Sequence, residues 1–167
     1  PAETPAAPEG PATVITSREL EMQSGAERNV FYFTGDVKVE GNNLTVTCDA
    51  MEVISTRQGA DADATIGRLG AIRKIIATGN VVILQEGRKA TAGRAEIFPA
   101  EGKVHLKDDP VFTDAEATVR GYEMVLDKDR RRAIVTPYPA GQGGRTTVEL
   151  PTLPDIAHDE EPEDATE

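Results

Sequence analysis

The chain has 167 residues, of which 38% are hydrophobic and 28% charged, and a formal net charge of −11. Its single cysteine excludes an intrachain disulfide, and no apolar run reaches the roughly 18 residues that a membrane-spanning helix needs. The acidity lies near the ends, because residues 137–167 hold eight acidic side chains and one arginine, while residues 14–136 are close to neutral. A neutral central region lacks a dense phosphate-neutralising surface, which argues against nucleic acid as a partner.

The elements follow in chain order. Residues 1–13 are rich in proline and alanine and predict a disordered linker; the start at Pro1 rather than Met is typical of a mature form after removal of a secretory signal, or of a shortened chain. Alternation with period two predicts strands over 14–22, 29–40, 44–54, 71–85, 88–98, 103–107, 111–126 and 131–136. Glycines and aspartates over 57–70 predict an inserted surface loop, and 137–167 predict a disordered acidic tail. The predicted domain is therefore 14–136.

A repeated break in the alternation is the most informative feature of these strands. Segments 48–53, 92–97 and 119–124 share one pattern. Apolar residues occupy every second position up to a break, two positions are then passed over, and the alternation resumes; segment 17–22 fits the same pattern. Such a skip keeps one side of a strand inward only if the strand carries a bulge or a sharp bend. The preceding strands carry Gly35-Asp36-Val37 and Gly79-Asn80-Val81, and a looser third copy carries Pro110. The sequence therefore predicts an all-β fold built from repeated antiparallel hairpins.

The inward positions of these strands are candidates for an apolar binding surface. The residues predicted to line it are Phe31, Phe33, Val37, Val39, Val46, Met51, Val53, Ile75, Ile83, Ala92, Ile97, Leu106, Val119, Tyr122 and Met124. With no tryptophan, four phenylalanines and several inward alanines, this interior is under-filled, as a lipid-tail groove requires. The alternative, that these side chains pack against one another as an ordinary core, stays open.

The polar residues predict no catalytic chemistry. Four aligned glutamates lie between inward neighbours, so they are expected to point outward as solvated charges: Glu21, Glu52, Glu96 and Glu123. His105 and His158 are far apart, and Asp61 and Asp63 are too few ligands for a cation. Cys48 is in phase with inward residues and is expected to be a buried, inert thiol. We therefore expect no enzyme activity, no cofactor and no metal.

The runs 15–22, 33–39 and 44–53, with Gly79-Asn80-Val81, resemble the OstA-like (LptA-like) family of lipopolysaccharide-transport proteins, over about residues 14–136. The resemblance implies a periplasmic β-jellyroll, open at both ends, whose interior holds the acyl chains of lipopolysaccharide or a similar glycolipid. It also implies that edge strands pair with other jellyroll components at the inner and outer membranes. The 57–70 insertion and the shortened third hairpin depart from the family pattern.

Two functional hypotheses follow. In the first, the protein is a non-enzymatic lipid carrier that associates head to tail with like domains through residues 14–22 and 131–136. In the second, it is a structural β-repeat scaffold that self-assembles through the same edges without a lipid ligand. Only the first predicts an amphiphile that co-purifies with the protein.

Overall fold

The computed structural model describes residues 13–41, 43–58 and 68–151, and in these ranges it confirms the predicted all-β fold. The strands are β1 (Val14–Thr16), β2 (Glu19–Ser24), β3 (Arg28–Gly41), β4 (Leu44–Gln58), β5 (Arg68–Gln85), β6 (Arg88–Phe98), β7 (Lys103–Lys107), β8 (Val111–Thr113), β9 (Thr118–Arg120), β10 (Glu123–Asp127), β11 (Arg132–Thr136) and β12 (Thr147–Glu149). Two short 3₁₀ turns, η1 (Pro99–Glu101) and η2 (Ala140–Gln142), complete the described elements. None of the described helical segments is long and apolar enough to cross a membrane.

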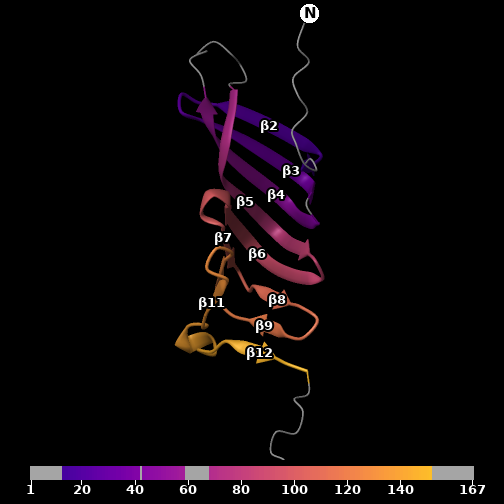
Figure 1. Ribbon diagram of the computed structural model, residues 1–167, viewed down its shortest axis with the longest axis vertical. Helices are drawn as coiled ribbons and strands as arrows, with labels where there is room; N and C mark the ends of the chain where they lie inside the picture. Colours follow the sequence, from indigo (N-terminus) through magenta and orange to yellow (C-terminus); the bar gives the residue numbers. More distant parts are fainter. Residues whose placement is uncertain (1–12, 42, 59–67, 152–167) are drawn as a thin grey trace, which may run out of the picture.

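The sheet divides into two layers that share the four long strands β3 to β6. The first layer runs β2-β3-β4-β5-β6-β7-β10-β11, and the second runs β1-β3-β4-β5-β6-β8-β9-β12. The long strands contribute one half to each layer: residues 94–98 of β6 pair with β7, whereas residues 89–91 pair with β8. All these pairings are antiparallel, and the strands follow one another along the long axis of the molecule (Figure 1).

A bend in the middle of each long strand separates the two layers. In β3 the bend is Gly35-Asp36, with φ of 81° and 46°, and in β5 it is Gly79-Asn80, with φ of 78° and 47°. The register of the sheet shifts at both places, as the break in alternation predicted. Glycine adopts such positive φ values without steric cost, and Asp or Asn tolerates them better than most residues.

The third bend is made differently from its two predecessors. Asp108 and Asp109 have φ of 60° and 55° and join β7 to β8, so this aspartate pair replaces the glycine-Asx pair. The backbone N–H of Gly93 in β6 donates to the carbonyl oxygen of Asp108 at 2.9 Å. This hydrogen bond holds the third bend against β6. Pro110 follows at the start of β8 and is buried.

Two predicted strands are divided in the structure. Segment 14–22 forms β1 and β2, because the N–H of Arg18 donates to the Gly35 carbonyl at 2.9 Å and thereby continues the bend of β3. Segment 111–126 forms β8, β9 and β10. Oδ1 of Asp114 accepts hydrogen bonds from the backbone N–H groups of Glu116 and Ala117, both at 2.8 Å, and this turn ends β8.

The predicted loop and termini need correction where the structure describes them. The ends of the predicted 57–70 loop belong to strands, since β4 extends to Gln58 and β5 begins at Arg68; positions 59–67 lie outside the described residues. Within the predicted 137–167 tail, β12 pairs with β9 and extends the second layer. Local composition did not reveal this strand because its partner is supplied by the rest of the sheet. Residues 1–12 and 152–167 lie outside the described residues.

Candidate functional site

The inner face of the first layer carries two parallel rows of apolar side chains that cross all its strands. The row beside the bends, here called the near row, contains Leu20, Phe33, Met51, Ala77, Ala95, Leu106, Met124 and Val135. The far row, two residues further from the bends, contains Met22, Phe31, Val53, Ile75, Ile97, Val104, Leu126 and Ala133. Period-two alternation within each strand places both rows on one face.

The second layer contributes a corresponding row, here called the facing row. It contains Ile15, Val39, Val46, Ile83, Ala90, Phe112, Val119 and Val148. Val37, Cys48, Val81 and Ala92 lie between this row and the bends. Buried members of both layers form one hydrophobic cluster, so the two inner faces enclose a common apolar interior.

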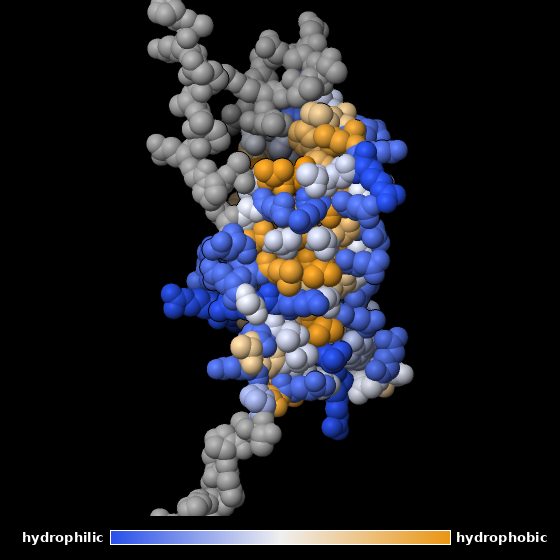
Figure 2. Space-filling view, turned by 90° about the vertical axis from the view of Figure 1, so that its right-hand side faces the viewer, coloured by the Kyte–Doolittle hydropathy of each residue, from blue (hydrophilic) through white to orange (hydrophobic). Residues whose placement is uncertain are grey.

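Burial is most complete in the middle of the near row and uneven in the far and facing rows. In the near row, Ala77, Ala95 and Leu106 have no exposed surface. In the far row Val53 is buried, but Phe31 and Ile75 are only half-buried, as are Ile83 and Val119 in the facing row. Figure 2 shows hydrophobic patches following one another down the long axis on one side of the molecule, with polar side chains between them. The interior is thus most tightly packed in the middle of the near row, whereas some residues of the other two rows keep part of their apolar surface exposed.

The apolar rows also reach both ends of the sheet. At the β2 edge Leu20 and Met22 are 51% and 40% exposed, and at the β12 edge Val148 is 54% exposed. In the described residues β2 pairs only with β3, and β12 pairs only with β9, so each has an edge without a partner. Both ends therefore offer unpaired backbone groups beside exposed apolar side chains, which is the combination that edge-to-edge pairing uses.

The structure brings most of the predicted lining residues together. Eight are buried: Val37, Val39, Val46, Met51, Val53, Ala92, Leu106 and Met124. Five more are partly buried and packed against the hydrophobic cluster: Phe31, Phe33, Ile75, Ile83 and Val119. Ile97 is half-buried between Ile75 and Val104 in the far row. Ile15, Val81 and Phe112 were missed, although their alternation with polar neighbours was a usable signal.

Tyr122 was predicted to face the interior, and this prediction is wrong. The side chain is 42% exposed, and its ring meets the ring of Tyr138 edge-on, with centroids 6.0 Å apart. Tyr122 lies in the bend between β9 and β10, where its N–H donates to the carbonyl of Thr136 at 2.9 Å. The preceding Gly121 is buried, and a Cβ there would meet Val135 at 2.3 Å, so the chain turns outward at this point.

Cys48 is buried, as predicted. Burial is the main cause that raises its pKa from 9.0 to about 11, and the nearby Asp49 carboxylate raises it further. A thiol with such a pKa carries almost no thiolate at neutral pH, and thiolate is the nucleophilic form. Cys48 is therefore a packing residue of the interior.

Glu96 lies on the outer face of the first layer, but the expectation of a solvated charge there is wrong. Its side chain is 8% exposed; Oε1 lies 2.7 Å from Nζ of Lys74 and 3.5 Å from Arg94, and Oε2 lies 3.1 Å from Nζ of Lys107. The hydrogen bond from Lys74 is the main cause that lowers the pKa of Glu96 to about 2, against the opposing effect of burial. Glu21 is exposed, and Glu52 and Glu123 are half-buried.

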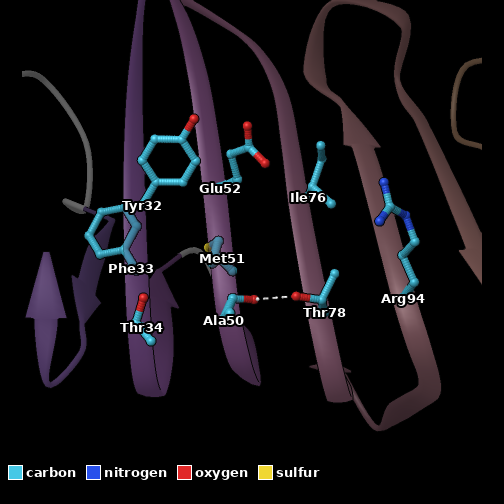
Figure 3. A pocket seen from close by; sticks show the side chains of 9 residues that line it. All are labelled: Tyr32, Phe33, Thr34, Ala50, Met51, Glu52, Ile76, Thr78 and Arg94. Carbon is cyan, nitrogen blue, oxygen red and sulfur yellow. Dashed lines mark hydrogen bonds between the residues drawn. The ribbon is translucent and has the colours of Figure 1, made fainter. Parts of the chain in front are cut away.

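A small pocket lies near this carboxylate on β3 to β6 (Figure 3). It is lined by Tyr32, Phe33, Thr34, Ala50, Met51, Glu52, Ile76, Thr78 and Arg94. Its volume of about 140 Å³ is below the range of roughly 300–1,000 Å³ in which drug-sized ligands are held.

The described residues do not form a recognisable metal centre. No group of three or more His, Cys, Asp or Glu side chains among them is arranged to hold a metal ion. His105 packs edge-on against the ring of Phe98, with centroids 5.1 Å apart, and His158 lies outside the described residues.

Comparison with known proteins adds two findings. A model of the family described as "LptA/(LptD N-terminal domain) LPS transport protein" matches residues 14–132, more than two thirds of the chain. The structure is similar to that of LptH from Pseudomonas aeruginosa, described as the LptA-homologous periplasmic component of the conserved lipopolysaccharide transport device. That match has a TM-score of 0.65 and 14% sequence identity, and it covers 84% of this chain and 96% of the other. At this identity the likeness shows a shared fold.

Proposed function

Because the chain belongs to the LptA/LptD N-terminal-domain family of lipopolysaccharide transport proteins, we propose that it is a periplasmic carrier of lipopolysaccharide or a similar glycolipid. In this proposal the acyl chains lie along the far row and the facing row, where Phe31, Ile75, Ile83 and Val119 keep apolar surface exposed. Moving such chains out of water contributes roughly 0.8 kcal/mol per buried CH₂ group. No covalent step is needed, so the carrier acts without catalysis.

The single observation that carries this proposal is the partial exposure of apolar side chains on the inner faces of central strands. Val39, Val46 and Ala90 of the facing row are buried, but a filled core would also bury Ile75 and Ile83 in the central strand β5, and these two remain half-buried. The far row runs from the β2 edge to the β11 edge, and the facing row runs from the β1 edge to the β12 edge. A continuous apolar path of this kind supports the passage of acyl chains from one domain to the next.

We further propose that copies, or related jellyroll components at the inner and outer membranes, associate head to tail. Pairing of one molecule's β2 with β11 of the next would set Leu20 beside Val135 and continue the near row across the junction. Pairing of β1 with β12 would in the same way place Ile15 beside Val148. Two strands would then define each junction, which fixes one register for both layers.

Site-specific photocrosslinking tests the lipid-carrying proposal. A photoreactive side chain at Ile83, on the facing row, is expected to crosslink to radiolabelled lipopolysaccharide. The same group at the adjacent Leu84, which is 45% exposed on the outer face, is the matched control and is expected to give at most a weak product. Equal crosslinking at both positions would show that lipid does not distinguish the interior from the outer surface.

The scaffold hypothesis remains the second candidate, because Leu20, Met22 and Val148 are exposed at the edges, where self-assembly needs no lipid. Native mass spectrometry of protein purified from Gram-negative cells separates the two. A co-purifying amphiphile is expected for a carrier, and assembled protein without any amphiphile for a scaffold.

A further inference from the structure

Beside the apolar far row lies a short polar row formed by side chains of β2, β3 and β4. Ser24 pairs with Asn29, and Asn29 pairs with Ser55, so the three residues are consecutive neighbours across the sheet. Asn29 and Ser55 lie on the same face as Phe31 and Val53, because they are two positions away from them along their strands. Polar side chains therefore end the apolar interior on this side.

Two polar atoms of this row are buried without a hydrogen-bond partner in the described structure. Asn29 is 3% exposed and Ser55 is 2% exposed, and the unpartnered atoms are Nδ2 of Asn29 and Oγ of Ser55. Oδ1 of Asn29 is used, since it accepts a hydrogen bond from Oγ of Ser24 at 2.7 Å. Turning the amide over would leave the carbonyl oxygen unpaired instead, so one atom of Asn29 stays unused in either orientation.

Such groups are unusual in a folded protein. Most buried polar side-chain atoms are paired, and an unpaired one bears the full desolvation cost of leaving water. Here two of them stand on neighbouring strands as a directly opposed pair, one an amide and the other a hydroxyl. In the described orientation of the Asn29 amide both groups can donate, so together they match an oxygen acceptor with two lone pairs.

Building on the proposed carrier function, we infer that Asn29 and Ser55 form a polar subsite for the carbonyl oxygen of an ester- or amide-linked acyl chain. The hydrocarbon part of the chain lies on the far row, against Phe31, Val53 and Ile75, and the carbonyl group reaches the polar row when the groups that cover Asn29 and Ser55 in the lipid-free structure are displaced. The subsite fixes how far the acyl chain enters the interior. It also selects chains joined through a carbonyl over plain alkyl chains.

The test compares two soluble probes that differ only in this carbonyl group. They are 1-lauroyl lysophosphatidylglycerol, which is ester-linked, and 1-O-dodecyl lysophosphatidylglycerol, which is ether-linked. Isothermal titration calorimetry of the full chain is expected to show about fivefold to tenfold tighter binding of the ester, the effect of one or two hydrogen bonds. Ser55→Ala and, separately, Asn29→Leu are expected to reduce that preference to about twofold or less while leaving ether binding unchanged.

Controls distinguish the subsite from a structural role. Thr91→Ala removes a hydroxyl from a position that alternates with buried Ala90 and Ala92, and it should leave the ester preference intact. In the lipid-free protein, Ser55→Ala should leave the midpoint of urea unfolding unchanged or raise it, because the Ser55 hydroxyl makes no hydrogen bond that the substitution could remove. A lower unfolding midpoint with an unchanged ester preference would indicate that Asn29 and Ser55 stabilise the folded protein by hydrogen-bonding a buried water. That result would overturn the inference.

The remaining outcomes separate this inference from the carrier proposal. If the parent binds both probes equally well, the subsite is wrong and the carrier function stands. If a folded variant loses both probes in equal proportion, the residues shape the interior rather than recognise a carbonyl, and the inference is again wrong. If the parent binds neither probe and Ile83 gives no crosslink, the carrier proposal itself fails.

Discussion

The ammonium nitrogen of Lys74 in β5 lies 2.7 Å from Oε1 of Glu96 in β6, on the outer face of the first layer. The same nitrogen stands 5.2 Å from the centroid of the Phe98 ring, a cation–π distance. Lys107 in β7 reaches the other oxygen of Glu96 at 3.1 Å. One buried carboxylate thus ties three neighbouring strands together on the side opposite the apolar interior.

Replacing Glu96 by Gln should destabilise the protein in a pH-dependent way. Because the folded-state pKa of Glu96 is lowered from 4.5 to about 2, its stabilising effect is fully present above pH 4.5 and is lost as the pH falls toward 2. At pH 7 we expect Glu96→Gln to lower the free energy of unfolding by about 1–3 kcal/mol. Urea unfolding at pH 7 and at pH 2.5 checks this, and a difference of the same size at both values would contradict it.

The bend of β5 should be sensitive to any side chain at Gly79. A Cβ there would lie 2.4 Å from Oδ2 of Asp49, which also accepts the hydrogen bond from Nδ2 of Asn80 at 3.0 Å. Gly87 is the matched control, since it has the same φ of 78° but no atom within 4 Å of its Cβ position. We expect Gly87→Ala to cost about 1 kcal/mol and Gly79→Ala about 2–4 kcal/mol in thermal or urea unfolding. Equal costs would show that the contact with Asp49 is unimportant.

A charge on the facing row should abolish lipid binding. Val119 is inward and partly buried, whereas the adjacent Thr118 points to the outer face, so Val119→Asp and Thr118→Asp place the same carboxylate on opposite sides of β9. Only the first forces acyl chains to compete with a carboxylate and its water. Binding of lipid A to variants with intact circular dichroism is expected to fall at least tenfold for Val119→Asp. Retention of the parent affinity would remove this row from the site.

Association through the sheet edges should depend on the exposed residues of β2. Leu20→Asp places a charge on the end of the near row, where Leu20 is 51% exposed. Leu84→Asp changes a leucine of similar exposure, 45%, in the central strand β5 and serves as the control. Sedimentation at increasing concentration should show weaker association for Leu20→Asp alone. A parent protein that stays monomeric at high concentration would contradict edge assembly.

Residues 14–136 are predicted to fold by themselves, but less stably than a chain that also contains β12. Truncation after Thr136 removes β12, the hydrogen bond from Tyr138 to Asp109 at 3.0 Å and the ring contact with Tyr122. Truncation after Pro151 retains all three. We expect a cooperative transition in both, with the free energy of unfolding lower by about 1–2 kcal/mol for the shorter chain. Loss of cooperativity in the shorter chain would place the domain boundary beyond 136.

The alternation in the sequence predicted the fold class and most of the interior correctly. Val37, Leu106 and Met124 were placed inward, and they are among the most deeply buried residues. The glycine-Asx pairs marked the bends at Gly35 and Gly79 before any contact was known. These features are local, because the face on which a strand residue lies depends only on its distance along that strand from the bend.

Burial itself was decided by the tertiary structure. Glu96 and Glu21 occupy the same kind of position in the repeat, yet Glu96 is buried beneath lysines from β5 and β7 while Glu21 is exposed at the edge. Tyr122 has the spacing of an inward residue but lies in a bend beside Tyr138. The sequence by itself thus determined the strands, their inward sides and the places where they bend. Only the assembled sheet decided which inward residues are covered, because coverage depends on what the neighbouring strands and the opposite layer place over each residue.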